Sequence, residues 1–415
     1  MRATLLLLCC SALAAGDLAQ LQQLTHDRRF FDLRRTLRQP GWNNADTLFY
    51  RGLVASRFGH ETEGIQLLRE FLEAKPDADS AQRALQEITA ALMRLGRYRE
   101  ASQVCNEALT SPSKNPSDRE DDENTRALLD AIGEAAPETV EFTAAAPIKA
   151  AHNHLASWNV PVQVNGVAGD WVFDTGASIT TVSESEAKRM GLTVRDSKAH
   201  AISASDKRIA VRVAVADLQF GPAHVRNAIL LVLSDQALYI APVHEQMTGA
   251  LGLPVLRALG RVGISRDGAV EIGPAKSMPA GDPNLFFDNG LAMVEISRGE
   301  PALPMTQALQ MTLDTGYAST VLNPSFHRAL TDQETANLKI QKGGFGSAGG
   351  SVERDMAVIP ELQIRVLTKT VDMKNPILLS DTPKGDARYR DGVIGIDALW
   401  SGFLLDFESM RLTIN

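Results

Sequence analysis

The chain has 415 residues, a formal net charge of −8 and 44% hydrophobic residues. This length exceeds one typical domain, and the composition is that of a soluble globular protein. The negative net charge argues against nucleic acid as a partner, because phosphate binding requires a basic face.

The N-terminus has the features of a secretory leader. Arg2 precedes an apolar run over residues 4–13, and Ala12-Leu13-Ala14 fits a cleavage site with small residues. We therefore predict a signal peptide over residues 1–15 and a periplasmic or secreted protein. The run is too short for a membrane span, and an uncleaved apolar helix is the alternative interpretation.

Residues 16–112 have a helical pattern and contain two related units. Gly59 aligns with Gly96, and each unit ends with a proline, Pro76 in the first and Pro112 in the second. The spacing resembles tetratricopeptide repeats, and a generic helical hairpin domain fits equally well. Such a domain is expected to bind a protein partner or to regulate the rest of the chain.

Two charged segments are predicted to be solvated. The arginine-rich stretch from Arg28 to Arg38 is interpreted as a solvated helix face rather than a binding patch. Residues 113–146 begin with polar, acidic and proline-containing sequence, which predicts a linker followed by a short helix.

From Thr139 onward the pattern changes to short β runs separated by glycine and proline. Similar features recur in the same order in two lobes, residues 147–278 and 279–415. The predicted fold is therefore multidomain, with an all-α N-terminal domain followed by a mostly-β region of two lobes.

Two motifs carry this duplication. Asp-Thr-Gly at residues 174–176 recurs at 314–316. Gly-Ala-Leu-Gly at residues 249–252 corresponds to Gly-Val-Ile-Gly at 392–395. A single Asp-Thr-Gly is a weak signal, whereas the doubled set with matching order is specific.

The two aspartates, Asp174 and Asp314, are the candidate catalytic residues. Two carboxyl groups held close together cannot both ionise cheaply, so they share a proton. One can then accept a proton from water while the other donates a proton to a substrate carbonyl oxygen. For either aspartate alone, the alternative is a turn residue that caps the end of a strand.

These motifs resemble the aspartic proteases, with a bilobal pepsin-like architecture and retroviral-type features, over about residues 147–415. The resemblance implies an aspartic endopeptidase with one catalytic Asp from each lobe, a peptide or protein substrate, and no metal or cofactor. It also implies that Thr175 and Thr315 hydrogen-bond across the lobe interface. A catalytically inactive peptide-binding or scaffold protein that uses the same cleft is the alternative.

The residues around each aspartate are expected to support the dyad. Glycines allow the loop to turn tightly and allow the strand behind it to approach closely. The predicted support residues are Thr175, Gly176, Ser178, Gly252, Thr315, Gly316, Ser319 and Gly395.

Hairpin tips at residues 203–207 and 343–350 are predicted to lie over the cleft, where an extended substrate would bind as an added strand. The candidate substrate-binding residues are Ser205, Gly346 and Tyr317. The glycine-rich second tip fits a mobile flap or an ordinary flexible loop.

Both loops depart from the pepsin-like pattern directly after Asp-Thr-Gly. Ala177 and Tyr317 stand where many such enzymes have a hydroxyl residue, and retroviral-type enzymes also have Ala. Loss of the hydroxyl bonds should leave the pKa values of the dyad higher, which predicts a weakly acidic optimum. The Tyr317 ring either fills the cleft or lines a specificity pocket.

Overall fold

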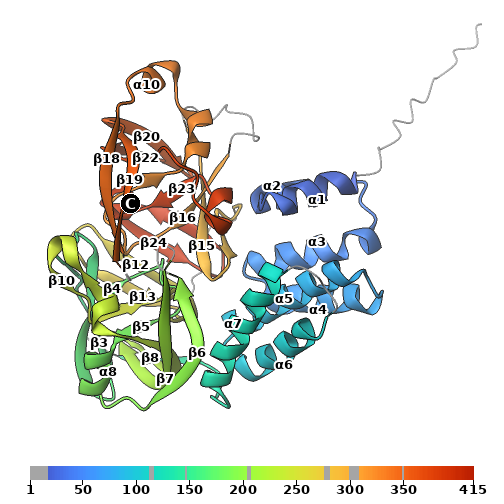
Figure 1. Cartoon of the computed structure of the whole chain (residues 1–415), viewed down its shortest axis with the longest axis horizontal. Coiled ribbons are helices and arrows are strands. Elements are labelled where there is room, and N and C mark those ends of the chain that lie inside the picture. Colours follow the sequence, from blue (N-terminus) through green and yellow to red (C-terminus); the bar gives the residue numbers. More distant parts are fainter. Residues whose placement is uncertain are drawn as a thin grey trace, which may run out of the picture.

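The computed structural model describes residues 17–111, 116–144, 147–202, 207–274, 281–298, 308–347 and 350–415. The helices of residues 18–132 lie together on one side of the molecule, and the mostly-β region lies beside them (Figure 1). This arrangement agrees with the predicted order of an all-α region followed by a mostly-β region. The predicted signal peptide lies outside the described residues.

The helical region pairs successive helices. Its elements are α1 (Leu18–His26), α2 (Phe30–Leu37), α3 (Asn44–Arg57), α4 (Glu61–Glu73), α5 (Ala78–Arg94), α6 (Tyr98–Leu109) and α7 (Pro116–Ile132). Gly59 joins α3 to α4 and Gly96 joins α5 to α6, with φ of +87° and +68°. Glycine adopts these left-handed angles without strain, so the aligned glycines occupy equivalent turns. The assignment to tetratricopeptide repeats stays a prediction.

The acidic segment from Pro116 onward is a helix, and the predicted linker is wrong there. α7 has 17 residues. Its buried Asp122 accepts a hydrogen bond from the Gln82 side chain at 2.9 Å. Arg126 pairs with Asp130 one turn later. Such spacing stabilises a helix, and packing on α5 supplies the partners that composition alone does not reveal.

α7 also contacts the β region directly. The Asn124 side chain donates to the His200 carbonyl at 3.1 Å and accepts from the His200 amide at 2.9 Å. The Arg195 side chain donates to the Ile132 carbonyl at the end of α7, at 2.8 Å. The helix is therefore fixed along β6 (Val194–Ile202).

The N-terminal half of the β region begins after α7. Its elements are β1 (Thr139–Phe142), β2 (Ala151–His152), β3 (Trp158–Val164), β4 (Val167–Phe173), β5 (Thr181–Ser183), α8 (Glu184–Arg189), β6, β7 (Arg208–Phe220), β8 (Ala223–Leu233), η1 (Asp235–Leu238), β9 (Tyr239–Ile240), η2 (Ala241–Val243), β10 (Glu245–Gln246), β11 (Gly249–Leu251), α9 (Leu253–Ala258), β12 (Arg261–Ser265) and β13 (Val270–Gly273).

The C-terminal half follows. Its elements are β14 (Leu285–Asp288), β15 (Leu291–Ile296), β16 (Leu309–Leu313), β17 (Val321–Leu322), η4 (Pro324–Ala329), α10 (Asp332–Ala336), β18 (Ile340–Ser347), β19 (Gly350–Val358), β20 (Glu361–Val366), β21 (Lys369–Lys374), β22 (Ile377–Leu379), η5 (Gly385–Tyr389), β23 (Gly392–Ile394), η6 (Ile396–Leu399), β24 (Gly402–Asp406) and β25 (Arg411–Ile414).

The sheets of the two halves share one internal strand order. The first contains β8-β5-β11-β4-β3 and the second contains β22-β17-β23-β16-β15. In each, the central strand runs parallel to the strand before the Asp loop and antiparallel to the strand after it. A separate sheet, β13-β12-β24-β25, joins the halves because β12 pairs with β24.

Buried apolar clusters connect all three regions. The largest spans both halves of the β region. A second joins α5–α7 to β7 and β8. In a third, Phe30 and Phe31 of α2 contact Phe286 of β14, with ring centroids 5.4 and 4.9 Å apart. The helical region therefore shares its core with both halves.

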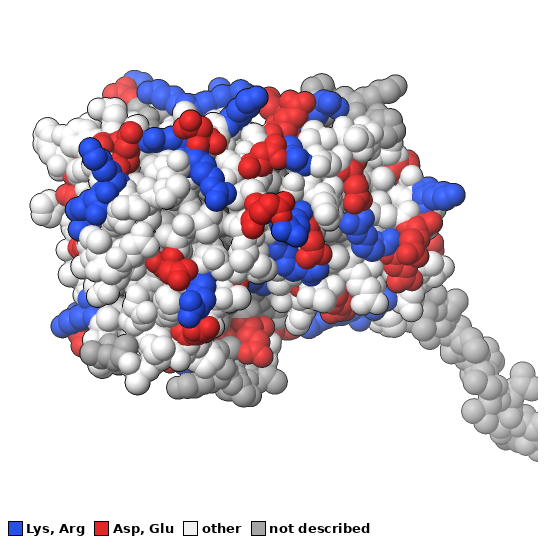
Figure 2. Space-filling model, turned by 90° about the horizontal axis from the view of Figure 1, so that it is seen from below, with Lys and Arg blue, Asp and Glu red and all other residues white. Residues whose placement is uncertain are grey.

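Charged side chains of both signs are interspersed over the face shown in Figure 2. Many form ion pairs, such as Arg119 with Glu123 at 3.1 Å. Within the described chain, no helix combines the length and apolarity needed to cross a membrane.

Candidate active site

Asp174 and Asp314 each follow directly after a buried strand, β4 and β16. The Asp174 amide donates to the Leu251 carbonyl at 3.1 Å, and the Asp314 amide donates to the Ile394 carbonyl at 3.0 Å. Because these carbonyls belong to corresponding strands, β11 and β23, both loops begin at the same place in their sheets.

The two carboxyl groups meet where the loops face each other, so that each affects the pKa of the other. A Cβ atom on Gly176 would lie 2.3 Å from Cγ of Asp314. A Cβ atom on Gly316 would lie 2.7 Å from Cγ of Asp174. Each glycine therefore makes room for the aspartate of the opposite loop.

Thr175 and Thr315 join the loops through reciprocal hydrogen bonds. Each amide donates to the hydroxyl oxygen of the other threonine, at 3.0 and 3.1 Å. The Thr175 hydroxyl donates to the Leu313 carbonyl at 2.8 Å, and the Thr315 hydroxyl donates to the Phe173 carbonyl at 2.7 Å. Both threonines are fully buried, so this network fixes the separation of the aspartates.

The two carboxyl groups have unequal surroundings. Oδ1 of Asp174 accepts from the amides of Gly176 and Ala177 at 2.8 and 3.1 Å, which favours its charged form although burial raises its pKa. Oδ1 of Asp314 accepts from the Gly316 amide at 3.0 Å. Burial and the charge of Asp174 raise the pKa of Asp314 well above its usual value. The shared proton is therefore favoured on Asp314.

Gly252 and Gly395 lie directly behind the loops. The Gly252 amide donates to Oγ1 of Thr180 at 3.1 Å, and the Gly395 amide donates to Oγ1 of Thr320 at 3.2 Å. A Cβ atom would come within 2.6 Å of the Thr180 amide nitrogen or 2.7 Å of the Ser319 carbonyl carbon. Only glycine allows the supporting strand to approach so closely.

Ser178 and Ser319 occupy different surroundings from those predicted. Ser178 is exposed, and neither serine hydroxyl bonds to a dyad carboxylate among the described residues. The buried Thr180 and Thr320 support the loops instead. Sequence reasoning missed them, although each stands at the same offset from its aspartate and this recurrence could have identified them.

Other missed residues act on the second loop alone. Thr320 donates from its hydroxyl and its amide to the Asp397 carboxylate, at 2.7 and 2.9 Å. Pro254 stands at the corresponding position of the first half. The Ser157 hydroxyl, from the first half, donates to the Gly316 carbonyl at 2.9 Å.

The predicted hairpins are β6–β7 and β18–β19. Ser205 lies outside the described residues. Gly346 lies in β18 opposite Ser351. β19 lies beside β9 and η2 of the first half. The Lys207 ammonium nitrogen is 3.5 Å from where a Cβ on Gly350 would stand, so the two hairpins approach each other.

Tyr317 is partly buried, with its hydroxyl influenced by both the dyad and the second hairpin. Burial and the charge of Asp314 raise the pKa of this hydroxyl to about 12, against an opposing effect of Arg354 on β19. Arg354 itself pairs with Asp381 at 3.4 Å. The Tyr317 hydroxyl therefore stays protonated at neutral pH and can donate a hydrogen bond.

In the described ranges, no group of three or more His, Cys, Asp or Glu side chains is arranged to hold a metal ion.

Comparison with known families gives a match over the first loop. Residues 160–255 match the family model described as aspartyl protease. The matched segment contains Asp174, which begins the first Asp loop, and Gly252, whose amide bonds to Thr180 at the end of the same loop. The match supports an aspartyl protease and hence a peptidase. A comparison with curated proteins found no match.

Proposed function

We propose that this protein is an aspartic endopeptidase whose dyad is Asp174 and Asp314, one from each lobe of a bilobal fold. The observation that carries the proposal is the pair of facing carboxyl groups, held by the reciprocal bonds of Thr175 and Thr315. The family match over the first loop supports the same reaction class.

The inequality of the carboxyl groups assigns the roles. Ionised Asp174 accepts a proton from water, whose oxygen attacks the peptide carbonyl carbon, while Asp314 gives its proton to the carbonyl oxygen. The tetrahedral diol then collapses. Asp174 returns its proton to the leaving nitrogen, the C–N bond breaks, and Asp314 regains a proton from the diol hydroxyl.

Substrate would lie extended between the dyad and the two hairpins, bonded through its backbone as an added strand. Ser205, Gly346 and Tyr317 remain the proposed binding residues. The protonated hydroxyl of Tyr317 would donate to a substrate carbonyl close to the scissile bond, and its ring would bound one specificity pocket.

The remaining parts of the chain have proposed roles of their own. Residues 1–15 would direct the protein to the periplasm or the outside of the cell. The helical region would bind a protein partner or regulate activity. Contacts of its described residues with the β region include those of α7 with β6 and of α2 with β14.

A second candidate function is peptide binding without cleavage. It is favoured by Tyr317, whose partly buried hydroxyl lies close enough to Asp314 to be affected by its charge. If the ring occupies the position that a scissile carbonyl needs, the same cleft would hold peptides and leave them intact.

One experiment separates the two functions. The mature chain is incubated with an unbiased peptide mixture from acidic to neutral pH, with and without pepstatin, beside Asp174→Asn and Asp314→Asn. The exposed Asp79→Asn, at the start of α5, is the matched control. We expect cuts that vanish in both dyad variants and persist in the control.

Cuts that survive in either dyad variant would refute the proposed function. Peptides that bind with measurable heat and are never cut would establish the second function instead.

A further inference from the structure

The arginine-rich stretch from Arg28 to Arg38 packs on the second half of the β region, which corrects the predicted solvated face. Side-chain exposure is 23% for Arg28, 20% for Arg29, 18% for Arg34 and 23% for Arg35. Only Arg38, at 54%, is largely exposed. Arg29 and Arg35 pair locally with Asp32, but their other carboxylate partners, Asp391 and Glu295, are far away in sequence, so no local pattern indicates those contacts.

At the centre of this contact lies the buried Gln310, the second residue of β16. Its side-chain amide donates to the Arg28 carbonyl at 2.8 Å and to the Tyr389 carbonyl at 3.2 Å. Its backbone amide donates to Oδ2 of Asp391 at 2.9 Å, and its carbonyl accepts from the Asp391 amide at 2.8 Å. The turn between α1 and α2 is thereby bonded to the start of β16.

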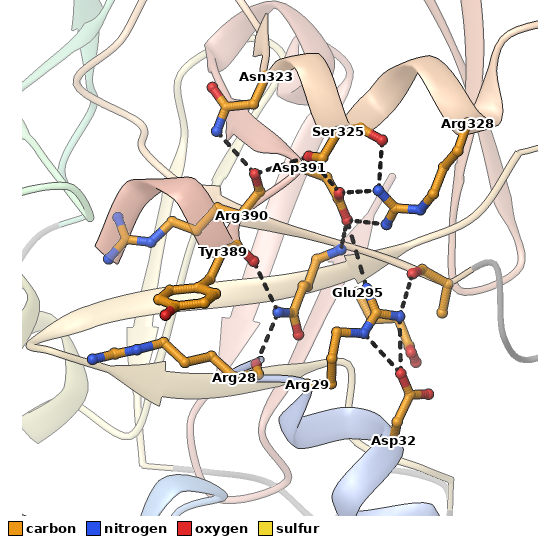
Figure 3. A network of polar contacts seen from close by, with 12 residues as sticks. Arg28, Arg29, Asp32, Glu295, Asn323, Ser325, Arg328, Tyr389, Arg390 and Asp391 are labelled. Atoms are coloured by element: carbon orange, nitrogen blue, oxygen red, sulfur yellow. Dashed lines mark hydrogen bonds and ion pairs between the residues drawn. The ribbon is translucent and has the colours of Figure 1, made fainter. Parts of the chain in front are cut away.

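Asp391, which directly precedes β23, is held from two sides (Figure 3). Arg328 donates to both of its carboxylate oxygens, at 2.5 and 2.7 Å. From the helical region, Arg29 approaches Oδ2 at 3.9 Å and donates to the Ala308 carbonyl at 2.8 Å. The Asp391 side chain is only 4% exposed, so these cations compensate a buried charge.

Both strands that hold Asp314 begin in this network. β16 runs from the network to Asp314, and β23 ends at Ile394, whose carbonyl accepts from the Asp314 amide. The strands are paired along their length, with Met311 opposite Gly392. A displacement at their start therefore changes where Asp314 stands relative to Asp174.

The first half has no helix at the corresponding place among the described residues. Asp170 and Thr248 stand where Gln310 and Asp391 stand in the second half. The Thr248 hydroxyl donates to the Asp170 carbonyl at 3.3 Å in an exposed setting. The helical support is therefore specific to the second loop.

We propose that α1 and α2 are a positioning element of the second Asp loop, acting through Gln310, Arg29 and Asp391 to set the placement of Asp314 against Asp174. This inference rests on the proposed function. The helical region is then a working part of the enzyme, and these three are positioning residues that do not touch substrate.

The test uses the full-length variants Gln310→Met, which keeps side-chain length, and Arg29→Met, which keeps an unbranched apolar stem. Both remove the donors. Arg34→Met is the matched control, because Arg34 lies in α2, the helix that begins directly after Arg29, and pairs with Asp282, whose side chain is 73% exposed. Kinetics on a cleaved peptide are compared at a temperature where melting curves show every variant folded.

We expect Gln310→Met and Arg29→Met to lower kcat about tenfold, equivalent to about 1.4 kcal/mol, with KM within about twofold of the parent. The acidic limb of the pH–rate profile should shift as well, and Arg29→Lys should restore both. Arg34→Met should behave as the parent chain does.

A second readout does not need activity. Titration of the dyad is followed by carboxyl NMR on chains labelled at Asp, and the donor-deleting variants should shift it while Arg34→Met should not. If the titration and the kinetics of Gln310→Met and Arg29→Met follow the control, the inference is overturned. If the parent chain cleaves nothing, the proposed function has failed and the titration still decides the positioning role.

Discussion

Asp174 and Asp314 stand at the ends of corresponding strands, but their loops have different supports. Both loops share the cross-bonded threonines and a glycine behind the turn. Behind the first loop, Oγ1 of Thr180 accepts from the Gly252 amide, and Pro254 stands where the second half has Asp397. Behind the second, Thr320 is bonded to the Asp397 carboxylate.

This difference separates what a two-carboxylate site requires from what each half adds to it. The shared bonds set the distance between the carboxyl groups. The additional polar contacts of the second half, from Asp397 and from Gln310 with α2, hold the loop whose aspartate keeps the proton. Variants that act on one loop at a time can test this division.

The largest expected effect comes from the glycines that face the opposite aspartates. Gly176→Ala and Gly316→Ala should each lower kcat/KM at least about 100-fold, because the new methyl group displaces a carboxyl. Gly176→Ala should be the more harmful, since its Cβ contact is shorter, 2.3 against 2.7 Å. Gly273→Ala is the control, because nothing lies within 4 Å of its Cβ position. An alanine variant at either loop that cleaves like the parent chain would break the comparison.

The next effect concerns stability. Thr320→Val removes a bond to the partly buried Asp397 carboxylate and should lower the free energy of unfolding by about 2 kcal/mol. Thr180→Val removes a bond to a neutral amide and should cost about 1 kcal/mol. Urea unfolding of both variants measures the difference. Equal costs would show that Asp397 adds nothing to the second loop.

The pH dependence of stability should also differ between the aspartates. The pKa of Asp314 is raised in the folded state, so its favourable contribution is complete below the unfolded value of about 3.9 and is lost as pH rises through the folded value. Asp314→Asn should therefore raise the melting temperature at neutral pH and leave it unchanged in strong acid. Asp174→Asn should raise it less, because two amides already stabilise that charge. Melting curves in which Asp174→Asn gains more would reverse the assignment of the proton.

The smallest effects are expected at the two serines beside the loops. Ser178→Ala and Ser319→Ala should change kcat/KM less than about twofold and the free energy of unfolding by under about 0.5 kcal/mol. Neither hydroxyl bonds to a dyad carboxylate in the part of the chain that the structure describes. A tenfold loss in either variant would show that the hydroxyl bonds the dyad during catalysis.

The sequence indicates the two Asp loops because the chemistry is local there. Three consecutive residues specify a turn beside a carboxylate, and their repetition predicts a pair. Gly252 and Gly395 can be predicted from the sequence as well, because close approach of two backbone segments requires glycine. The order of a helical region followed by a mostly-β region can likewise be predicted from short-range hydrophobic periodicity.

Long-range partners could not be predicted in the same way. The bond between Arg28 and Gln310 joins residues that are 282 positions apart, and nothing near Arg28 in the sequence indicates it. The acidic composition of α7 did not indicate a helix that packs on the rest of the chain. The Gln82 side chain that bonds to the buried Asp122 belongs to another helix, so the local sequence does not reveal it. Thr180 and Thr320 could have been predicted by comparing the sequences of the two halves, since each stands at the same offset from its aspartate.

The central claim is that Asp174 and Asp314 form one catalytic unit, and a double-mutant cycle tests it most directly. The kcat/KM for one cleaved peptide is measured for Asp174→Asn, Asp314→Asn and the double variant. We expect each single variant to lose as much activity as the double variant, because residues that act as a unit are strongly non-additive. A single variant that keeps more than about a tenth of the parent activity would contradict the claim.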